Sequence, residues 1–351
     1  MTPSQGQAGT THEVPLANGG TPLGNEVVEH VDRPGPSIVH FLGRFQDRAV
    51  LLVLLAASII GFGLASQNFF TISNATTILA SVAVLAILST GQTFAIVSGG
   101  FDLGITGTVP LAGIMYVFIY NAGVPWVPAV VATVAIGAGV GAVSGGFVGT
   151  LGINPLIVTL GMASVAGGAA EVLAKGSSVS LQPATLNWIG GASVGTLANT
   201  VWVALVVVLV GWAILRFTVP GVSLYAIGGN REAAWLAGIR VRFLTFSVYM
   251  FSGALSGLAG AIITSELLVG SPSVAANDAL ESIAAVVLGG GALTGGVGDP
   301  WGTSAAVLVL GVIADGLILL QVSPFYQEIA TGAVLLLVVS LARARTKLAE
   351  Q

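Results

Sequence analysis

Long apolar runs separated by short polar breaks make up most of the chain from about residue 48 to residue 342. A helix needs about 20 mostly apolar residues to cross a hydrocarbon core roughly 30 Å thick. Strands of a membrane barrel alternate apolar and polar positions, whereas runs such as 201–210 are continuously apolar. The pattern therefore predicts membrane-spanning helices. Ten candidate spans are 48–66, 75–97, 104–121, 126–148, 155–174, 199–219, 243–266, 281–298, 301–320 and 325–342.

Glycine and proline interrupt this pattern at several places within the membrane. Residues 98–100 read Ser-Gly-Gly directly before Asp102, and Asn154 precedes Pro155 as a helix N-cap precedes a first-turn proline. Glycines at 289–291 and 295–296 fall within the candidate span 281–298. Broken helices occur in membranes where they line a cavity or pack against protein. We therefore expect broken or re-entrant segments here, and most of all at 281–298.

Composition supports a membrane location. The chain is 54% hydrophobic and 7% charged, whereas soluble domains carry about 25% charged residues. It has no cysteine, which excludes disulfides and thiolate chemistry. Residues 1 to about 40 are rich in Gly, Pro, Thr and Asn and lack the apolar centre of a signal peptide. We expect a disordered cytoplasmic tail over 1–44, a transmembrane domain over 45–342 and a short cytoplasmic tail over 343–351.

The cationic residues indicate the orientation. If all ten spans cross, ten of the eleven Lys and Arg residues fall on one side and only Lys175 falls on the other. The positive-inside rule then places both termini and the segment 216–242 in the cytoplasm. If 281–298 did not cross, the basic C-terminus would lie outside. The charge pattern therefore favours ten crossings of the membrane.

Segment 216–242 is a polar island in this apolar sequence. Asn230 follows two glycines that indicate a turn, and it can cap a helix over 231–239. That helix would carry a small-residue face of alanines beside the apolar Trp235 and Leu236. One interpretation is an amphipathic helix lying on the membrane surface. The other is a knob that docks into a groove of a partner, with a few anchor residues supplying most of the binding.

Four stretches, in the same order along the chain, resemble the ribose-type permeases of ATP-binding-cassette (ABC) importers. They are GQTFAIVSGGFDLGITG (91–107), NPLIVTLGMASVAGG (154–168), YAIGGNREAAWLAGIRVR and its continuation to 262 (225–262), and LESIAAVVLGGGALTGGVGDPWGT (280–303). The resemblance extends from about residue 48 to 342. The chain differs from the family pattern by Gly104 in place of a serine, Asp315 in place of an asparagine, and the bulky Trp235.

The resemblance implies an all-α polytopic permease that works as a homo- or heterodimer. It also implies two cytoplasmic ATPase subunits and an extracytoplasmic sugar-binding protein as partners, with no nucleic-acid partner and no cofactor. The chain has no phosphate-binding loop of the G-x-x-x-x-G-K-[ST] type, so ATP hydrolysis would come from another polypeptide. By matching positions, the cytoplasmic coupling helix would comprise Gly229, Asn230, Glu232, Ala233, Ala234, Gly238 and Ile239.

Charged residues within or near spans need a separate explanation, because a charge at the bilayer centre costs ~3 kcal/mol on insertion scales. Asp102 either caps the broken helix or lines a pathway, whereas Glu171, Glu266 and Glu328 near span ends are expected to reach the interface. A path for neutral sugars should display hydroxyls and amides, not fixed charges, because neutral polyols need hydrogen bonds that are easily exchanged. Its candidate residues are Asp102, Thr93, Ser98, Asn154, Thr159, Ser164 and Asn277.

The resemblance implies import of a simple sugar or a similar small polar solute, with ribose, xylose, arabinose, galactose and nucleosides as possible cargo. The alternative is a proton- or sodium-coupled secondary transporter, with Asp102 and Asp315 as coupling residues. An intramembrane enzyme is disfavoured, because the spans hold no histidine and no close acid pair on one helix face. Glycines four residues apart at 141, 145 and 149, and at 253 and 257, predict close helix packing, either inside one chain or at a dimer seam.

Overall fold

A computed structural model describes residues 38–182, 188–323, 325–326, 329 and 332–333, with side chains from residue 51 onward. The chain divides into two units, Met1–Phe41 and Leu42–Gln351. Only residues 38–41 of the first unit are described, as the start of a helix. All packing reported below lies within the second unit.

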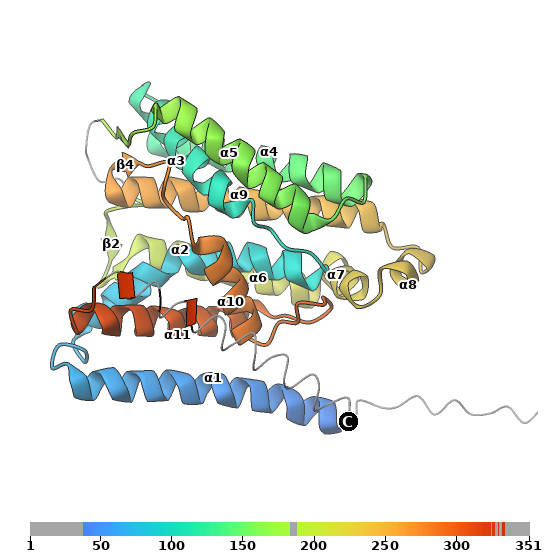
Figure 1. Ribbon diagram of the computed structural model, residues 1–351, viewed down its shortest axis with the longest axis horizontal. Helices are drawn as coiled ribbons and strands as arrows, with labels where there is room; N and C mark the ends of the chain where they lie inside the picture. The colour runs from blue at the N-terminus through green and yellow to red at the C-terminus, as the bar shows by residue number, and fades with distance from the viewer. Residues whose placement is uncertain (1–37, 183–187, 324, 327–328, 330–331, 334–351) are drawn as a thin grey trace, which may run out of the picture. The chain divides into compact units, whose positions relative to one another are not determined.

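Helices form nearly all the regular structure of the described residues (Figure 1). Two short antiparallel pairs join β1 (Val179–Ser180) to β4 (Val269–Gly270) and β2 (Ser193–Val194) to β3 (Leu197–Ala198). Six of the helices are long and apolar enough to cross a membrane. The helices are α1 (Ile38–Ala65), α2 (Ile72–Val97), α3 (Ile105–Asn121), α4 (Trp126–Gly145) with the π-helix η1 (Gly146–Thr150), α5 (Pro155–Ala174), α6 (Asn199–Phe217), α7 (Val219–Gly229), α8 (Arg231–Leu236), α9 (Val241–Leu267), α10 (Asp278–Leu288) and α11 (Pro300–Leu319).

Most of the spans expected from the sequence agree with these helices to within a few residues, and the breaks at 98–104 and 289–299 are confirmed. Span 325–342 lies mostly outside the described residues. Helix α1 ends at Ala65, close to the expected end of the first span, but begins earlier, at Ile38, so the helix extends into the segment expected as a tail over 1–44. Charges at 44, 47 and 48 argue against membrane burial, but they do not stop a helix, and no proline occurs between 36 and 110.

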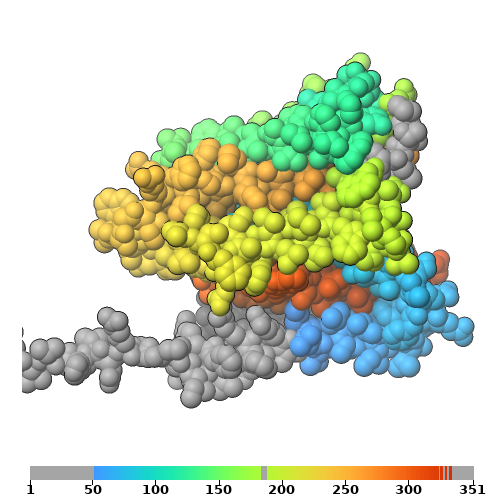
Figure 2. All heavy atoms as spheres, turned by 180° about the vertical axis from the view of Figure 1, so that it is seen from behind, coloured from blue at the N-terminus to red at the C-terminus, as the bar shows by residue number. Residues whose placement is uncertain are grey.

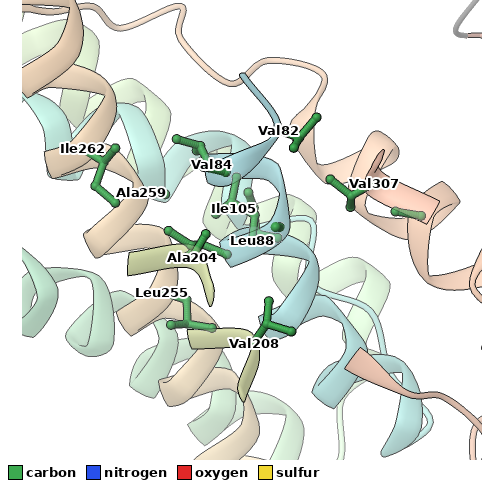
Figure 3. Close-up of a cluster of buried hydrophobic side chains, with 14 of the residues drawn as sticks. Val82, Val84, Leu88, Ile105, Ala204, Val208, Leu255, Ala259, Ile262 and Val307 are labelled. Atoms are coloured by element: carbon green, nitrogen blue, oxygen red, sulfur yellow. The ribbon is translucent and has the colours of Figure 1, made fainter. Parts of the chain in front are cut away.

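Helices α2 and α9 form the centre of the packing. Helix α9 contacts α2, α3 and α4, and α2 also contacts α6, α10 and α11. Figure 3 shows their apolar side chains meeting, with Leu88 of α2, Val208 of α6 and Leu255 of α9 in one buried cluster. Close packing of these buried side chains fixes α2 and α9 relative to the helices that they contact.

Glycines explain how closely α4 and α9 approach. A Cβ added at Gly257 would lie 2.6 Å from the Thr133 carbonyl oxygen, and one at Gly149 would lie 2.7 Å from that of Arg242. The backbones are therefore in direct contact, which small residues permit. Of the two interpretations of this glycine spacing, internal packing of one chain is confirmed for these faces.

The segment expected as the broken span 281–298 runs along much of the bundle without being one helix. Helix α10 begins at Asp278, which shares a cavity wall with Glu266 near the end of α9. After α10 ends, the chain continues as a non-helical loop to Gly296, whose amide donates to the carbonyl oxygen of Val97 at the end of α2 (3.0 Å). Glycines at 289–291 stop the helix, because Gly290 has a φ of +93°.

Candidate functional site

The polar island folds into two short helices at one end of the bundle, seen as the projecting yellow and gold segment in Figure 2. The turn expected at Gly228-Gly229 is wrong, since both residues complete α7. Thr218 caps that helix by accepting from the Gly221 amide (3.2 Å), and Pro220 occupies its first turn. A first-turn proline favours helix, because its fixed φ suits that position.

Asn230 caps α8, as expected. Its side-chain oxygen accepts a hydrogen bond from the Ala233 amide at 2.9 Å. The helix is shorter than the expected 231–239, because it ends at Leu236 and Gly238 follows with a φ of +82°. Glycine adopts this left-handed conformation at little cost, so it stops the helix and turns the chain toward α9.

The faces of α8 differ sharply in exposure. Trp235 and Leu236 are 66% and 73% exposed, whereas Ala234 is 4% exposed and packs with Leu224 and Val241. Of the residues expected in a coupling helix, Ala234 therefore anchors α8 to its own chain. The outward apolar pair, together with the exposed Ala233 and Glu232, forms the accessible surface.

A groove of about 440 Å³ runs beside α8, between this helix and the end of η1. Residues 149–152 form one wall, and Arg231, Glu232, Trp235 and Arg242 contribute to the other. The charged side chains of Arg231, Glu232 and Arg242 thus lie beside the exposed Trp235, an arrangement found at protein-binding sites with a few anchor residues.

Asp102 lies in the break between α2 and α3. Its Oδ1 accepts a hydrogen bond from the Gly104 amide at 2.9 Å, and the side chain is buried. Gly104 is the N-cap residue of α3, so this bond shapes the entry to that helix. The bond reaches the amide of the N-cap residue and not one of the first turn, so it favours a structural role for Asp102 just before α3 without making it the helix cap.

The remaining residues of the expected path are spread over the molecule. Thr93 pairs with Thr303 of α11 (hydroxyl to hydroxyl, 3.0 Å), and Ser98 donates to the Ala95 carbonyl oxygen. Asn154 caps α5, accepting from the Leu156 amide (2.9 Å), as expected from its place before Pro155. On α5, Thr159 is buried and Ser164 is exposed, and each hydroxyl donates to a carbonyl oxygen four residues earlier. Asn277, by contrast, lines a cavity near α10.

This cavity holds a group of acids that the sequence reasoning did not bring together. It has a volume of about 750 Å³ between α2, α10, α11 and the end of α9, and it is lined by Glu266, Asp278 and Glu281. Glu266 was expected at the interface and is half-buried here. The available signal was the pair of acids at 278 and 281, which precedes an apolar run as in a first helical turn.

Asp315 is paired within the chain. It is 8% exposed, and its Oδ2 accepts a hydrogen bond from the Asn74 side-chain nitrogen at 2.9 Å. Asn74 lies in the first turn of α2, so the bond joins α2 to α11. A buried carboxylate needs such a donor, because its desolvation is costly. Glu328 lies outside the described residues.

Comparison with known proteins identifies a matching protein family. The family described as branched-chain amino acid transport system / permease component matches residues 74–339. The Ribose import permease protein RbsC of Escherichia coli (strain K12) is 36% identical over 299 residues, covering 84% of this chain and 92% of that protein. The L-arabinose ABC transporter permease protein AraH of Azospirillum brasilense is 33% identical over 290 residues, covering 83% and 84%.

A third relative also matches over most of both chains. The D-allose transport system permease protein AlsC of Escherichia coli (strain K12) is 30% identical over 306 residues, covering 86% of this chain and 94% of that protein. No solved structure matches the chain.

Proposed function

The chain belongs to the branched-chain amino acid transport system / permease component family, and on that premise we propose that it is the transmembrane permease subunit of an ABC importer for a simple sugar. Similar proteins named for ribose, arabinose and allose transport support the cargo class. The observation that carries the proposal is the short helix α8, whose exposed Trp235 and Leu236 stand beside a groove at one end of the bundle.

In this proposal the permease acts as a dimer in the bacterial plasma membrane, energised by separate ATPase subunits. Helix α8 is the coupling helix, and its exposed Trp235 and Leu236 bind in a cleft of an ATPase subunit. Closure of the ATPases on ATP moves α8 and switches the dimer between outward and inward openings. An extracytoplasmic binding protein delivers the sugar to the opposite end, where the cavity near α10 lies.

Ten crossings with both termini in the cytoplasm complete the proposal. The ends of segment 278–298 support a crossing there, since one end lies by the end of α9 and the other contacts the residues just before α8. Helix α9, which joins those two ends of the bundle, has 27 residues. At 1.5 Å per residue that is about 40 Å, enough for a membrane.

The proton- or sodium-coupled alternative relied on Asp102 and Asp315. Both have local partners, the Gly104 amide and the Asn74 side chain, that give them structural roles. This geometry favours the importer over the secondary transporter. The two differ in a direct way, because a secondary transporter would take up solute with this chain alone and lose that uptake when an uncoupler is added.

The test removes the knob. We expect the double variant Trp235→Ala/Leu236→Ala to insert normally and to lose the cognate ATPase subunit on co-purification. Loss of two such anchors weakens binding by at least about 30-fold. The matched control is Leu267→Ala, an equally apolar exposed residue at the other end of α9. Ala234→Arg is unsuitable, since it would dislodge α8 itself.

Full recovery of the ATPase by the double variant would overturn the assignment of α8. ATP-independent, uncoupler-sensitive sugar uptake by the wild-type chain in liposomes would instead support the alternative. The cargo itself follows from calorimetric titration of the binding protein with ribose, xylose, arabinose, galactose and allose.

A further inference from the structure

Three glycine-rich segments, far apart in the sequence, meet next to the start of α8. They are residues 98–100 after α2, residues 228–229 at the end of α7, and residues 295–298 in the loop before α11. We call this meeting point the glycine junction. It touches both breaks in the membrane helices and the segment that leads into α8.

The contacts at the junction join backbone to backbone. The Gly296 amide donates to the Val97 carbonyl oxygen at 3.0 Å. A Cβ added at Gly295 would lie 2.8 Å from both the Gly228 carbonyl oxygen and the Gly99 Cα. These three segments of the chain are therefore in contact at one place. A Cβ at Gly228 would overlap the Val97 carbonyl oxygen and the Gly296 nitrogen. No side chain longer than hydrogen fits at Gly228 without displacing main chain.

One side-chain bond reinforces this arrangement. The Tyr225 hydroxyl, one turn before the end of α7, donates to the Gly298 carbonyl oxygen at 2.7 Å. Gly298 directly precedes Asp299, the residue that caps α11 by accepting from the Gly302 amide. Helix α7 is therefore tied to the entry of α11 by a bond that a single-atom change can remove.

We propose that the glycine junction transmits displacement of α8 to the two broken-helix loops, 98–104 and 289–299, and that Gly228 and Tyr225 are its positioning residues. This rests on the proposed function. Only Asn230 separates α7 from α8, so a shift of α8 moves Gly228. Because main-chain contacts offer no long side chain to absorb the shift, it passes to Gly295 and to the end of α2. Coupling of this kind needs a packed element with two arrangements.

The two loops are placed to open or close a path. Loop 98–104 leads through Asp102 into α3, and loop 289–299 leads into α11. Loop 98–104 joins α2 to α3 and loop 289–299 joins α10 to α11, and irregular backbone of this kind is tolerated in a membrane bundle if it is packed or lines a cavity. A shift at the junction would move both helix starts together, so that the two breaks respond to one ATPase movement.

The experiment uses the complete complex, reconstituted in liposomes with ATPase subunits and with binding protein loaded with the sugar that it binds most tightly. The two variants are Tyr225→Phe and Gly228→Ala. We expect Tyr225→Phe to retain the ATPase and its basal ATP hydrolysis, and Gly228→Ala, whose added methyl group overlaps main chain, to do so in the fraction of protein that folds. We expect stimulation of hydrolysis by loaded binding protein to fall by about fivefold or more, the range of ordinary coupling between sites, and transport to fall with it.

Two controls separate a loss of transmission through the glycine junction from a general loss of protein stability. Gly139→Ala places a methyl group in open space on α4, and we expect it to behave as wild type. Gly137→Ala places one against the Gly253 carbonyl oxygen, away from the junction, so it should lower the yield of folded protein without changing stimulation per molecule. If Gly228→Ala does not fold, Tyr225→Phe alone decides.

Unchanged stimulation and transport in Tyr225→Phe, with the ATPase bound, would overturn the proposal. Loss of the ATPase from Tyr225→Phe would also overturn it, because the junction would then belong to docking. Failure of the proposed function would show separately in the wild-type protein. It would then neither bind the ATPase nor support stimulation of ATP hydrolysis by loaded binding protein.

Discussion

Single polar residues hold the ends of the long helices together. Asp315 on α11 and Asn74 on α2 lie 241 positions apart and share one buried hydrogen bond. Thr93 and Thr303 join the same two helices farther along. The sequence indicated that Asp315 needed either a partner or access to water, since a charge in the membrane is costly. It could not indicate Asn74, because that pairing depends on how α2 and α11 pack.

Removing the donor tests this residue-scale interpretation. We expect Asn74→Ala to lower the free energy of unfolding by about 1–3 kcal/mol, because the Asp315 carboxylate remains buried without this bond. Thermal unfolding in detergent measures the effect, with Thr77→Ala, an exposed position of α2, as the control. The double variant Asn74→Ala/Asp315→Ala should lose less than the sum of the single changes. Strict additivity would show that the bond contributes nothing.

Helix positions were the part of the fold that the sequence predicted well. Continuous apolar runs fix where helices lie in a membrane, and Asn154-Pro155 fixes the start of α5 without any tertiary information. The ends of α1 and α8 were less well predicted. Neither the glycine junction nor the acidic cavity could be predicted, since both arise where segments from distant parts of the chain meet.

The crossing of α4 and α9 gives an element-scale prediction. We expect Gly137→Ala to destabilise the protein by about 1–3 kcal/mol, because its methyl group overlaps the Gly253 carbonyl oxygen and the helices must separate. Gly139→Ala, two residues later, meets no atom within 4 Å and should change stability by less than about 0.5 kcal/mol. Melting temperatures in detergent compare the two. Equal stabilities would mean that the backbones do not touch.

At the scale of the molecule, the two ends of the bundle differ in chemistry. One end carries α8, with Arg231, Arg240 and Arg242 nearby, whereas the acids at 266, 278 and 281 line the cavity at the other end of α9. The positive-inside rule predicted the first end from the sequence. The acidic end was not predicted, since its carboxylates belong to α9 and α10, which the sequence could not place side by side.

Orientation can be measured directly because the chain lacks native cysteine. We expect Ala237→Cys, exposed just after α8, to react with a membrane-impermeant maleimide only after cells are permeabilised. Ser178→Cys, exposed in the loop after α5, should react in intact cells and serves as the control. Labelling of position 237 in intact cells would place α8 outside and remove the basis for an ATPase partner.

Burial of Ala234 bears on any attempt to redesign partner choice. This residue packs α8 against Leu224 and Val241. The six-residue helix transplanted alone from a relative would therefore lack the side chains against which it packs in its own protein. A chimera would need to exchange the whole stretch from Leu224 to Val241. That stretch includes Gly228, so under the proposed coupling an exchange made to change the ATPase partner would also bring in the donor's contacts with loops 98–104 and 289–299.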